Sequence, residues 1–269
     1  MQGPVVVALG DSITYGVGDG TQRPETVSAV PVGWAAHVAH ALGASRFTNL
    51  AANGVRARHL AHSQVPTALM AQPDVVLMTV GGNDVLRGDF DPEDVRRDVA
   101  DALSRLARPG RTVVLLTLDR IGLFDLVGGP IADVMARRVG AANAALRLAA
   151  AGTGTLVVDG AAAIASSGRR GWHIDRVHPS ALGHRALAQY VIEQLDHLDL
   201  HQRLGREAGS TARLLPPQPS PSFADRLWWL ARHGTPWVAK RSRDLIPQVA
   251  AMVTHELLEE KRKARSATA

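Results

Sequence analysis

The chain has 269 residues, of which 46% are hydrophobic and 20% are charged, and its mean hydropathy is close to zero. This composition excludes disordered, collagen-like and membrane-spanning classes and predicts a soluble globular protein of one or two domains. Because the sequence contains no cysteine, disulfides, thiolate nucleophiles and cysteine-ligated zinc are excluded as well.

The formal net charge of +5 is concentrated in the C-terminal part of the chain. Residues 1–200 contain 18 basic and 19 acidic residues, whereas residues 201–269 contain 12 basic and 6 acidic residues. A nucleic-acid-binding domain would carry a basic stripe with interleaved aromatic residues, so we expect no nucleic-acid partner. No basic segment or cleavage site precedes the first apolar run, which predicts a cytoplasmic location.

Short apolar runs alternate with longer segments that have helical spacing. The predicted strands are 5–9, 47–50, 74–80, 112–118 and 155–158. The predicted helices are 33–42, 55–70, 92–107, 130–150 and 180–195. The run at 75–80 is apolar almost throughout, which is typical of a strand covered by helices on both faces. We therefore predict a three-layer, doubly wound α/β domain over residues 1–200, built on a five-stranded parallel sheet.

The last part of the chain is predicted to form a separate element. Residues 201–222 form a linker that ends in a Pro/Ser-rich stretch, and residues 223–269 form a basic helical extension that contains Trp228, Trp229 and Trp237. Its amphipathic spacing favours packing on the main domain as a lid, or a dimer contact. Tryptophans flanked by basic residues also fit peripheral membrane contact, so membrane contact or self-association through them stays open.

Glycines and polar residues follow the first three predicted strands. Ser12 comes after the first strand, Gly54 after the second and Asn83 after the third. Taken singly, each segment also fits an ordinary turn or helix cap. Ligands bind at the carboxyl ends of such strands, so we expect these residues to lie together.

A loop after the fifth strand supplies an acid and a base. Asp175 precedes His178 by three residues, so its carboxylate can accept from one imidazole nitrogen while the other nitrogen acts as general base. Ser12 would then be the nucleophile, and the Ser12 N–H, the Gly54 N–H and the Asn83 amide would stabilise the oxyanion. We further expect Asp11, Trp172 and His173 to be possible lining residues of the pocket. Neither a metal nor another cofactor is predicted, because no His-x-x-x-His pair with a neighbouring acid occurs among the histidines of the predicted helices, which are His37, His40, His59, His62 and His184.

Four segments together resemble the sequence blocks of the GDSL/SGNH hydrolase family. They are Gly10-Asp11-Ser12-Ile13, residues 49–54, residues 81–84 and the Asp175-x-x-His178-Pro179 sequence, in the order of that family. Ile13 stands where the family name has leucine. The resemblance implies a flavodoxin-like sheet and a serine ester hydrolase, with functional roles on Ser12, Gly54, Asn83, Asp175 and His178. It does not extend to the last 70 residues.

The leading hypothesis is a serine esterase (carboxylesterase or lipase-like) that acts on a small-molecule ester through an acyl-enzyme on Ser12. An acyltransferase would use the same acyl-enzyme, with an alcohol in place of water. A third hypothesis is a binding module that is recruited to a membrane or partner and retains a vestigial site. The resemblance does not choose the acyl group or the leaving group.

Overall fold

The computed structural model describes residues 3–20, 32–197 and 214–216, together with individual residues between 247 and 265. Most of the predicted linker and the three tryptophans of the extension lie outside these residues. Within the linker, Leu214 packs against the main domain and the carbonyl of Leu215 accepts a hydrogen bond from Arg185. In the described part of the chain, no helix is long and apolar enough to cross a bilayer.

The centre of the protein is one parallel sheet of five strands. The strands are β1 (Val5–Gly10), β2 (Arg46–Asn49), β3 (Val75–Thr79), β4 (Thr112–Leu116) and β5 (Leu156–Val158). Their order is β2-β1-β3-β4-β5, and every neighbouring pair is parallel. The predicted three-layer α/β fold is confirmed.

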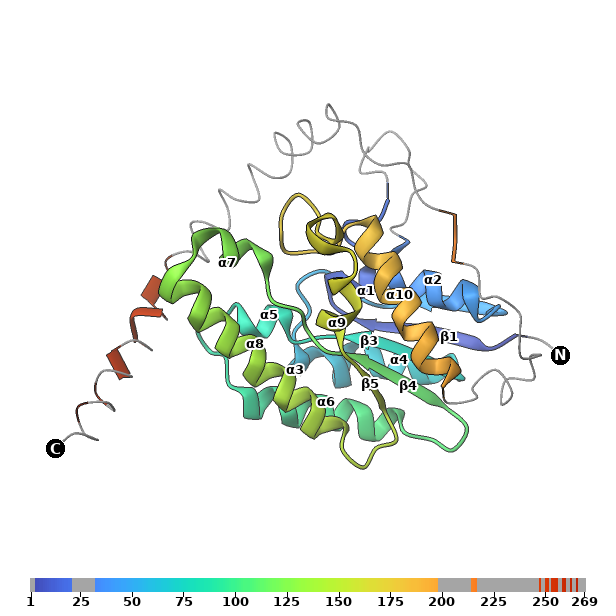
Figure 1. The fold of residues 1–269 in the computed structure, drawn as a ribbon. Helices are drawn as coiled ribbons and strands as arrows, with labels where there is room; N and C mark the ends of the chain where they lie inside the picture. Colours follow the sequence, from blue (N-terminus) through green and yellow to red (C-terminus); the bar gives the residue numbers. More distant parts are fainter. Residues whose placement is uncertain are drawn as a thin grey trace.

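Helices cover both faces of this sheet (Figure 1). The longer ones are α2 (Gly33–Ala41), α6 (Pro92–Leu106), α8 (Gly129–Ala150) and α10 (Ala181–Asp196). The helix predicted over 55–70 is divided into α3 (Ala57–His59), a π-helical turn η1 (Leu60–Gln64) and α4 (Val65–Met70). Pro66 directly follows the π-helical turn, in which the Val65 N–H bonds to the Leu60 carbonyl. A proline cannot donate the hydrogen bond of a regular α-helix, so the change of helix type falls where the proline requires it.

Five short elements were not predicted from the sequence. They are α1 (Ser12–Tyr15), α5 (Gly82–Val85), α7 (Gly122–Val127), α9 (Gly160–Ala165) and a 3₁₀ turn, η2 (Gly168–Gly171). The four α-helices among them follow the carboxyl ends of strands or the loops just beyond them. A segment of four to six residues is too short to show a helical period in the sequence.

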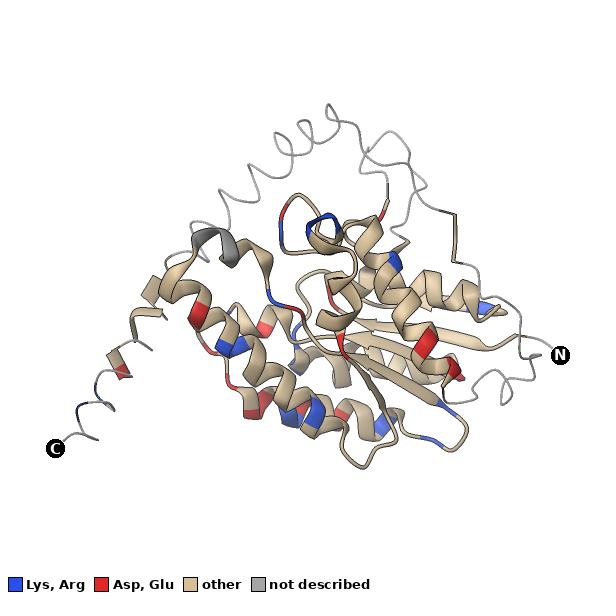
Figure 2. Ribbon diagram, viewed as in Figure 1, with Lys and Arg blue, Asp and Glu red and all other residues tan. Residues whose placement is uncertain are grey.

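The strands β1, β3, β4 and β5 contribute side chains to two apolar layers. On β1, Val6 and Ala8 pack with α2, α9 and α10, whereas Val7 and Leu9 pack with α3, α4, α6 and α8. This double burial explains why these four strands are apolar throughout rather than alternating. The edge strand β2 contributes only Phe47. Charged residues of both signs occur along α6 and α8 (Figure 2).

The strand order reverses beside β1. The chain passes from β1 to β2 on one side and then to β3 on the other side of β1. This leaves a crevice at the carboxyl ends of β1 and β3, which is where ligands bind in open parallel sheets.

Candidate active site

The turn after β1 is built around Gly10. Its φ of +116° favours glycine, and a Cβ at this position would lie 2.0 Å from the carbonyl oxygen of Thr79. The next residue, Asp11, donates its N–H to the same carbonyl (3.1 Å) and accepts the N–H of Ile13 on its side chain (3.0 Å). Asp11 therefore caps α1, and Ser12 is the first residue of that helix at the edge of the sheet.

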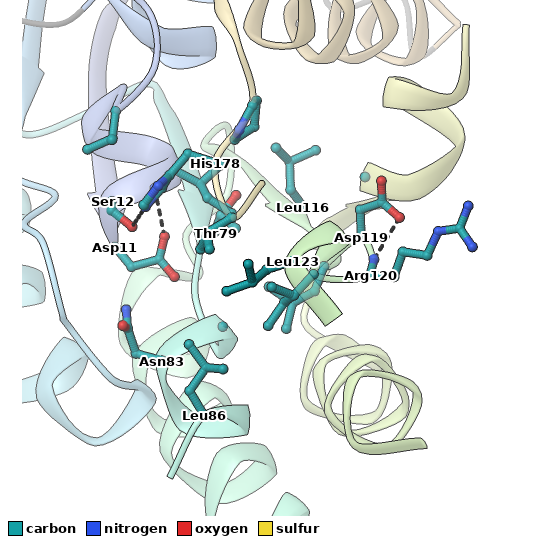
Figure 3. A pocket seen from close by; sticks show the side chains of 18 of the residues that line it. Asp11, Ser12, Thr79, Asn83, Leu86, Leu116, Asp119, Arg120, Leu123 and His178 are labelled. Atoms are coloured by element: carbon teal, nitrogen blue, oxygen red, sulfur yellow. Dashed lines mark hydrogen bonds between the residues drawn. The ribbon is translucent and has the colours of Figure 1, made fainter. Parts of the chain in front are cut away.

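Ser12, His178 and Asp175 form a continuous chain of hydrogen bonds. Ser12 Oγ lies 2.8 Å from His178 Nε2, and His178 Nδ1 lies 2.8 Å from Asp175 Oδ2. In Figure 3 the side chains of Ser12 and His178 point toward one another beside Asp11. An ionised Asp175 requires a proton on Nδ1, which leaves Nε2 free to accept the Ser12 hydroxyl proton.

The loop that carries Asp175 and His178 is held by hydrogen bonds from its backbone N–H groups to the Asp175 carboxylate and by a bridge between its ends. Asp175 Oδ1 accepts the N–H groups of Val177 (2.9 Å) and His178 (3.0 Å). The loop ends pair through an antiparallel bridge between Trp172 and Pro179. The acid and the base are therefore held by their own loop.

Gly54 and Asn83 come to the same side of Ser12. Both line the cavity that contains Ser12. The amide Nδ2 of Asn83 donates to the carbonyl of Val55 (3.1 Å), which joins the loop of Gly54 to the start of α5. The second hydrogen of this amide is available to a ligand, and Figure 3 shows Asn83 below Asp11 in the cavity wall.

Three supporting residues had no clear signal in the sequence. The buried side chain of Gln64 brackets Gly10, because its Oε1 accepts the Gly10 N–H (2.6 Å) and its Nε2 donates to the Gly10 carbonyl (3.0 Å). The buried Asp84 accepts from Arg56 Nε (3.0 Å) and from the Ala57 N–H (3.0 Å), which fixes α3 against α5. Gln64 follows two other polar residues, His62 and Ser63, so nothing in the sequence singled it out. Asp84 belongs to the segment 81–84 that the sequence analysis noted, but its contact with Arg56 joins residues that are far apart in the chain.

The two carboxyl groups next to the site have opposite electrostatic environments. Burial raises the pKa of Asp11 to about 7, an effect that His178 and the Ile13 N–H only partly offset. Burial would also raise the pKa of Asp175, but its contacts with His173 and His178 outweigh this effect and hold the pKa well below its usual range. Asp175 is therefore ionised throughout the physiological range, whereas Asp11 is partly protonated near neutral pH.

A cavity of about 270 Å³ opens beside Ser12. Asp11 and Trp172 line it, as the sequence suggested, but His173 does not. The wall opposite the serine consists mostly of apolar side chains, including Leu86, Leu116, Leu118, Ile121, Leu123 and Phe124. No group of potential metal ligands occurs among the described residues.

A five-stranded parallel sheet with helices on both faces and a serine at the strand-order reversal defines a class of three-layer α/β hydrolases. Residues 8–186 match the GDSL-like lipase/acylhydrolase family. The chain belongs to this family and is an ester hydrolase of the SGNH type. No curated protein matches the sequence.

Solved structures with the same fold are distant in sequence. A lipase, Lip_vut3 from a goat rumen metagenome, is 21% identical with a TM-score of 0.56, covering 71% of this chain and 96% of its own. Axe2, an acetylxylan esterase from Geobacillus stearothermophilus, is 22% identical with a TM-score of 0.55, covering 77% and 96%. TesA is 22% identical with a TM-score of 0.56, covering 72% and 99%. At these identities the likeness shows the shared fold.

Proposed function

We propose that this protein is a serine carboxylesterase that forms an acyl-enzyme on Ser12, with His178 as general base and Asp175 as the orienting acid. The observation that carries the proposal is the chain of two 2.8 Å hydrogen bonds from Ser12 through His178 to Asp175. A serine hydroxyl becomes a nucleophile only beside such a base, and the base needs an acid to fix its tautomer.

The reaction would proceed in two halves. In the first half, Ser12 Oγ attacks the ester carbonyl carbon while His178 Nε2 takes the hydroxyl proton, and His178 then protonates the departing alkoxide. In the second half, His178 removes a proton from water, the hydroxide attacks the acyl carbon, and Ser12 leaves with its proton restored. In both halves the negative oxygen accepts from the N–H groups of Ser12 and Gly54 and from the Asn83 amide.

The cavity favours an acyl group longer than acetyl. Its wall carries leucine, isoleucine and phenylalanine side chains, and each methylene of an acyl chain buried against them contributes about 0.8 kcal/mol. An acetyl group would leave most of this wall without a contact. We therefore expect a preference for esters whose acyl chain has several carbons.

The test is hydrolysis of p-nitrophenyl esters from acetate to palmitate, together with labelling by a fluorophosphonate. Ser12→Ala should abolish both hydrolysis and labelling. Ser63→Ala is the matched control, because Ser63 is an exposed serine that donates to the His59 carbonyl and does not line the cavity, and it should behave as the wild type. Labelling or wild-type turnover that persists in Ser12→Ala would overturn the assignment.

Labelling at Ser12 without ester hydrolysis would keep the nucleophile but contradict hydrolysis of these esters. In that case the next measurement would be transfer of the acyl group from Ser12 to an alcohol in place of water. A rate that is highest for acetate would contradict the acyl preference alone.

A further inference from the structure

Two histidines contact the same oxygen of Asp175. His178 Nδ1 lies 2.8 Å from Asp175 Oδ2, and His173 Nδ1 lies 3.1 Å from the same atom. The other oxygen of this carboxylate already accepts two backbone N–H groups. All three side chains are largely buried, with exposed fractions of 11% for His173, 9% for Asp175 and 14% for His178. Water therefore screens the contact only weakly.

The backbone holds His173 in this position. Its N–H donates to the carbonyl of His178 (2.9 Å), and its own carbonyl accepts the N–H of Arg176 (3.0 Å). On the other side lies Gly18, where an added Cβ would be 3.4 Å from the Cβ of His173. His173 is not among the residues that line the cavity. It therefore meets Asp175 rather than a substrate.

We propose that His173 is a positioning residue that shares the charge of Asp175 with His178 and thereby sets the pH at which Ser12 becomes reactive. The inference rests on the proposed roles of Ser12, His178 and Asp175. It adds a fourth residue to them, one that acts through the carboxylate and not on the substrate.

The direction of the effect is the same for a protonated His173 and for a neutral His173 whose ring proton is on Nδ1. In the neutral form, the Nδ1–H lies 3.1 Å from the oxygen that holds His178, which weakens the hold of Asp175 on the His178 imidazolium. A protonated His173 does the same more strongly, because it adds a positive charge close to His178. Removal of His173 should therefore make His178 retain its proton to higher pH.

Other groups act on His178 and stay unchanged in this comparison. Ser12 from α1 contacts its Nε2. Asp11, directly after β1, interacts with it through charge. His184 on α10 interacts with it only when protonated, and because burial lowers the pKa of His184 to about 4, His184 is neutral near physiological pH.

Two variants separate the polar contact from the charge. His173→Leu removes both ring nitrogens. His173→Asn places an amide N–H near the position of Nδ1 but cannot take up a proton. His62→Leu is the matched control, because His62 is an exposed histidine on η1 that does not line the cavity.

The measurement is the second-order rate constant of fluorophosphonate labelling as a function of pH. For His173→Leu, the midpoint of the acid limb should move upward by about half a pH unit or more. His173→Asn should lie between His173→Leu and the wild type, and His62→Leu should match the wild type. A lower rate with an unchanged midpoint would show that His173 only supports the loop, and a downward shift would also overturn the proposal.

A second readout separates this proposal from the proposed function. If the wild type is not labelled at all, the assignment of Ser12 fails. The midpoint of the His178 imidazole titration, followed by NMR in Ser12→Ala with and without His173→Leu, still tests His173 without any reaction. If His173→Leu does not fold, as judged by near-ultraviolet circular dichroism, His173→Phe keeps a ring without nitrogens and takes its place, with the same midpoint shift expected.

Discussion

Asp11 is a carboxyl group placed where ionisation is costly. It is buried between β1 and α5, and burial raises its pKa to about 7, with a further contribution from Asp84. In the unfolded chain the same group ionises near its usual value of 3.8. Between these two pH values the folded state binds a proton that the unfolded state has lost, so the free energy of unfolding contributed by Asp11 falls as pH rises.

Asp11→Asn should remove this pH dependence. The amide oxygen of asparagine can still accept the Ile13 N–H, so the cap of α1 is kept. We expect the variant to gain stability over the wild type by about 1.4 kcal/mol for each pH unit between pH 5 and the Asp11 pKa of about 7, and to gain little more above it. Urea unfolding at three pH values measures it.

The control is Asp91→Asn, which alters the corresponding cap of α6 at an exposed position. Its stability relative to the wild type should change little with pH. The free energies of unfolding of Asp11→Asn and of the wild type could instead change in parallel from pH 5 to 8. Asp11 would then be ionised in the folded state, and a contact other than the hydrogen bond from Ile13 would stabilise its charge.

At the scale of elements, α7 joins the apolar wall of the cavity to the loop that carries Asp175 and His178. The N–H of Leu123 donates to the carbonyl of Arg176 (2.9 Å), and Arg176 has a φ of +57° within that loop. Leu123 and Phe124 of the same helix line the cavity. We therefore expect a substitution in α7 to change first the preference among acyl chain lengths.

Leu123→Trp should shorten the acyl pocket. The larger side chain fills space that a longer acyl chain would occupy, and each displaced methylene forfeits about 0.8 kcal/mol. We expect kcat/KM for p-nitrophenyl octanoate to fall about tenfold or more relative to that for the acetate. The control Leu148→Trp adds the same bulk at a side chain of α8 that is 64% exposed, and it should leave the ratio unchanged. An equal loss for both esters in Leu123→Trp would place the acyl chain elsewhere.

The long elements could be predicted from the sequence, whereas the short helices could not. The observed ends of the strands and of α2, α6, α8 and α10 lie within two residues of their predicted bounds. Burial gives most of the strands a continuous apolar run and gives these helices a helical period, and both patterns can be seen in the sequence. By contrast, α7 has six residues and owes its place to the contact with Arg176. Such a contact depends on tertiary approach and leaves no local pattern.

At the scale of the molecule, parallel topology explains why the candidate site was visible in the sequence. All strands of a parallel sheet end at one edge, so Ser12, Asn83 and His178 could be grouped before any distance was known. The contact of His173 with Asp175 and the bracketing of Gly10 by Gln64 were not visible, because they depend on which way a side chain turns. Sequence order predicts which loops meet, and packing determines which atoms touch.

The described part of the C-terminal extension contacts the main domain. Val253 is 5% exposed and belongs to the core cluster that also contains Phe124 and Val134. The described residues around it are helical, and Leu258 is 55% exposed. This burial supports the interpretation that the extension packs on its own domain near α7 and α8, although its tryptophans lie outside the described residues.

Val253→Ala tests whether this contact stabilises the whole molecule. Loss of two buried methyl groups should lower the free energy of unfolding by about 1 to 3 kcal/mol. Leu258→Ala, on the same segment but exposed, should change it by less than about 0.5 kcal/mol. Denaturant unfolding at two protein concentrations measures both effects, and a loss that depends on concentration would indicate that Val253 acts through self-association. If Val253→Ala is as stable as Leu258→Ala, the contact of the extension does not contribute to the free energy of unfolding of the main domain. The apolar side of the extension would then be available to another partner.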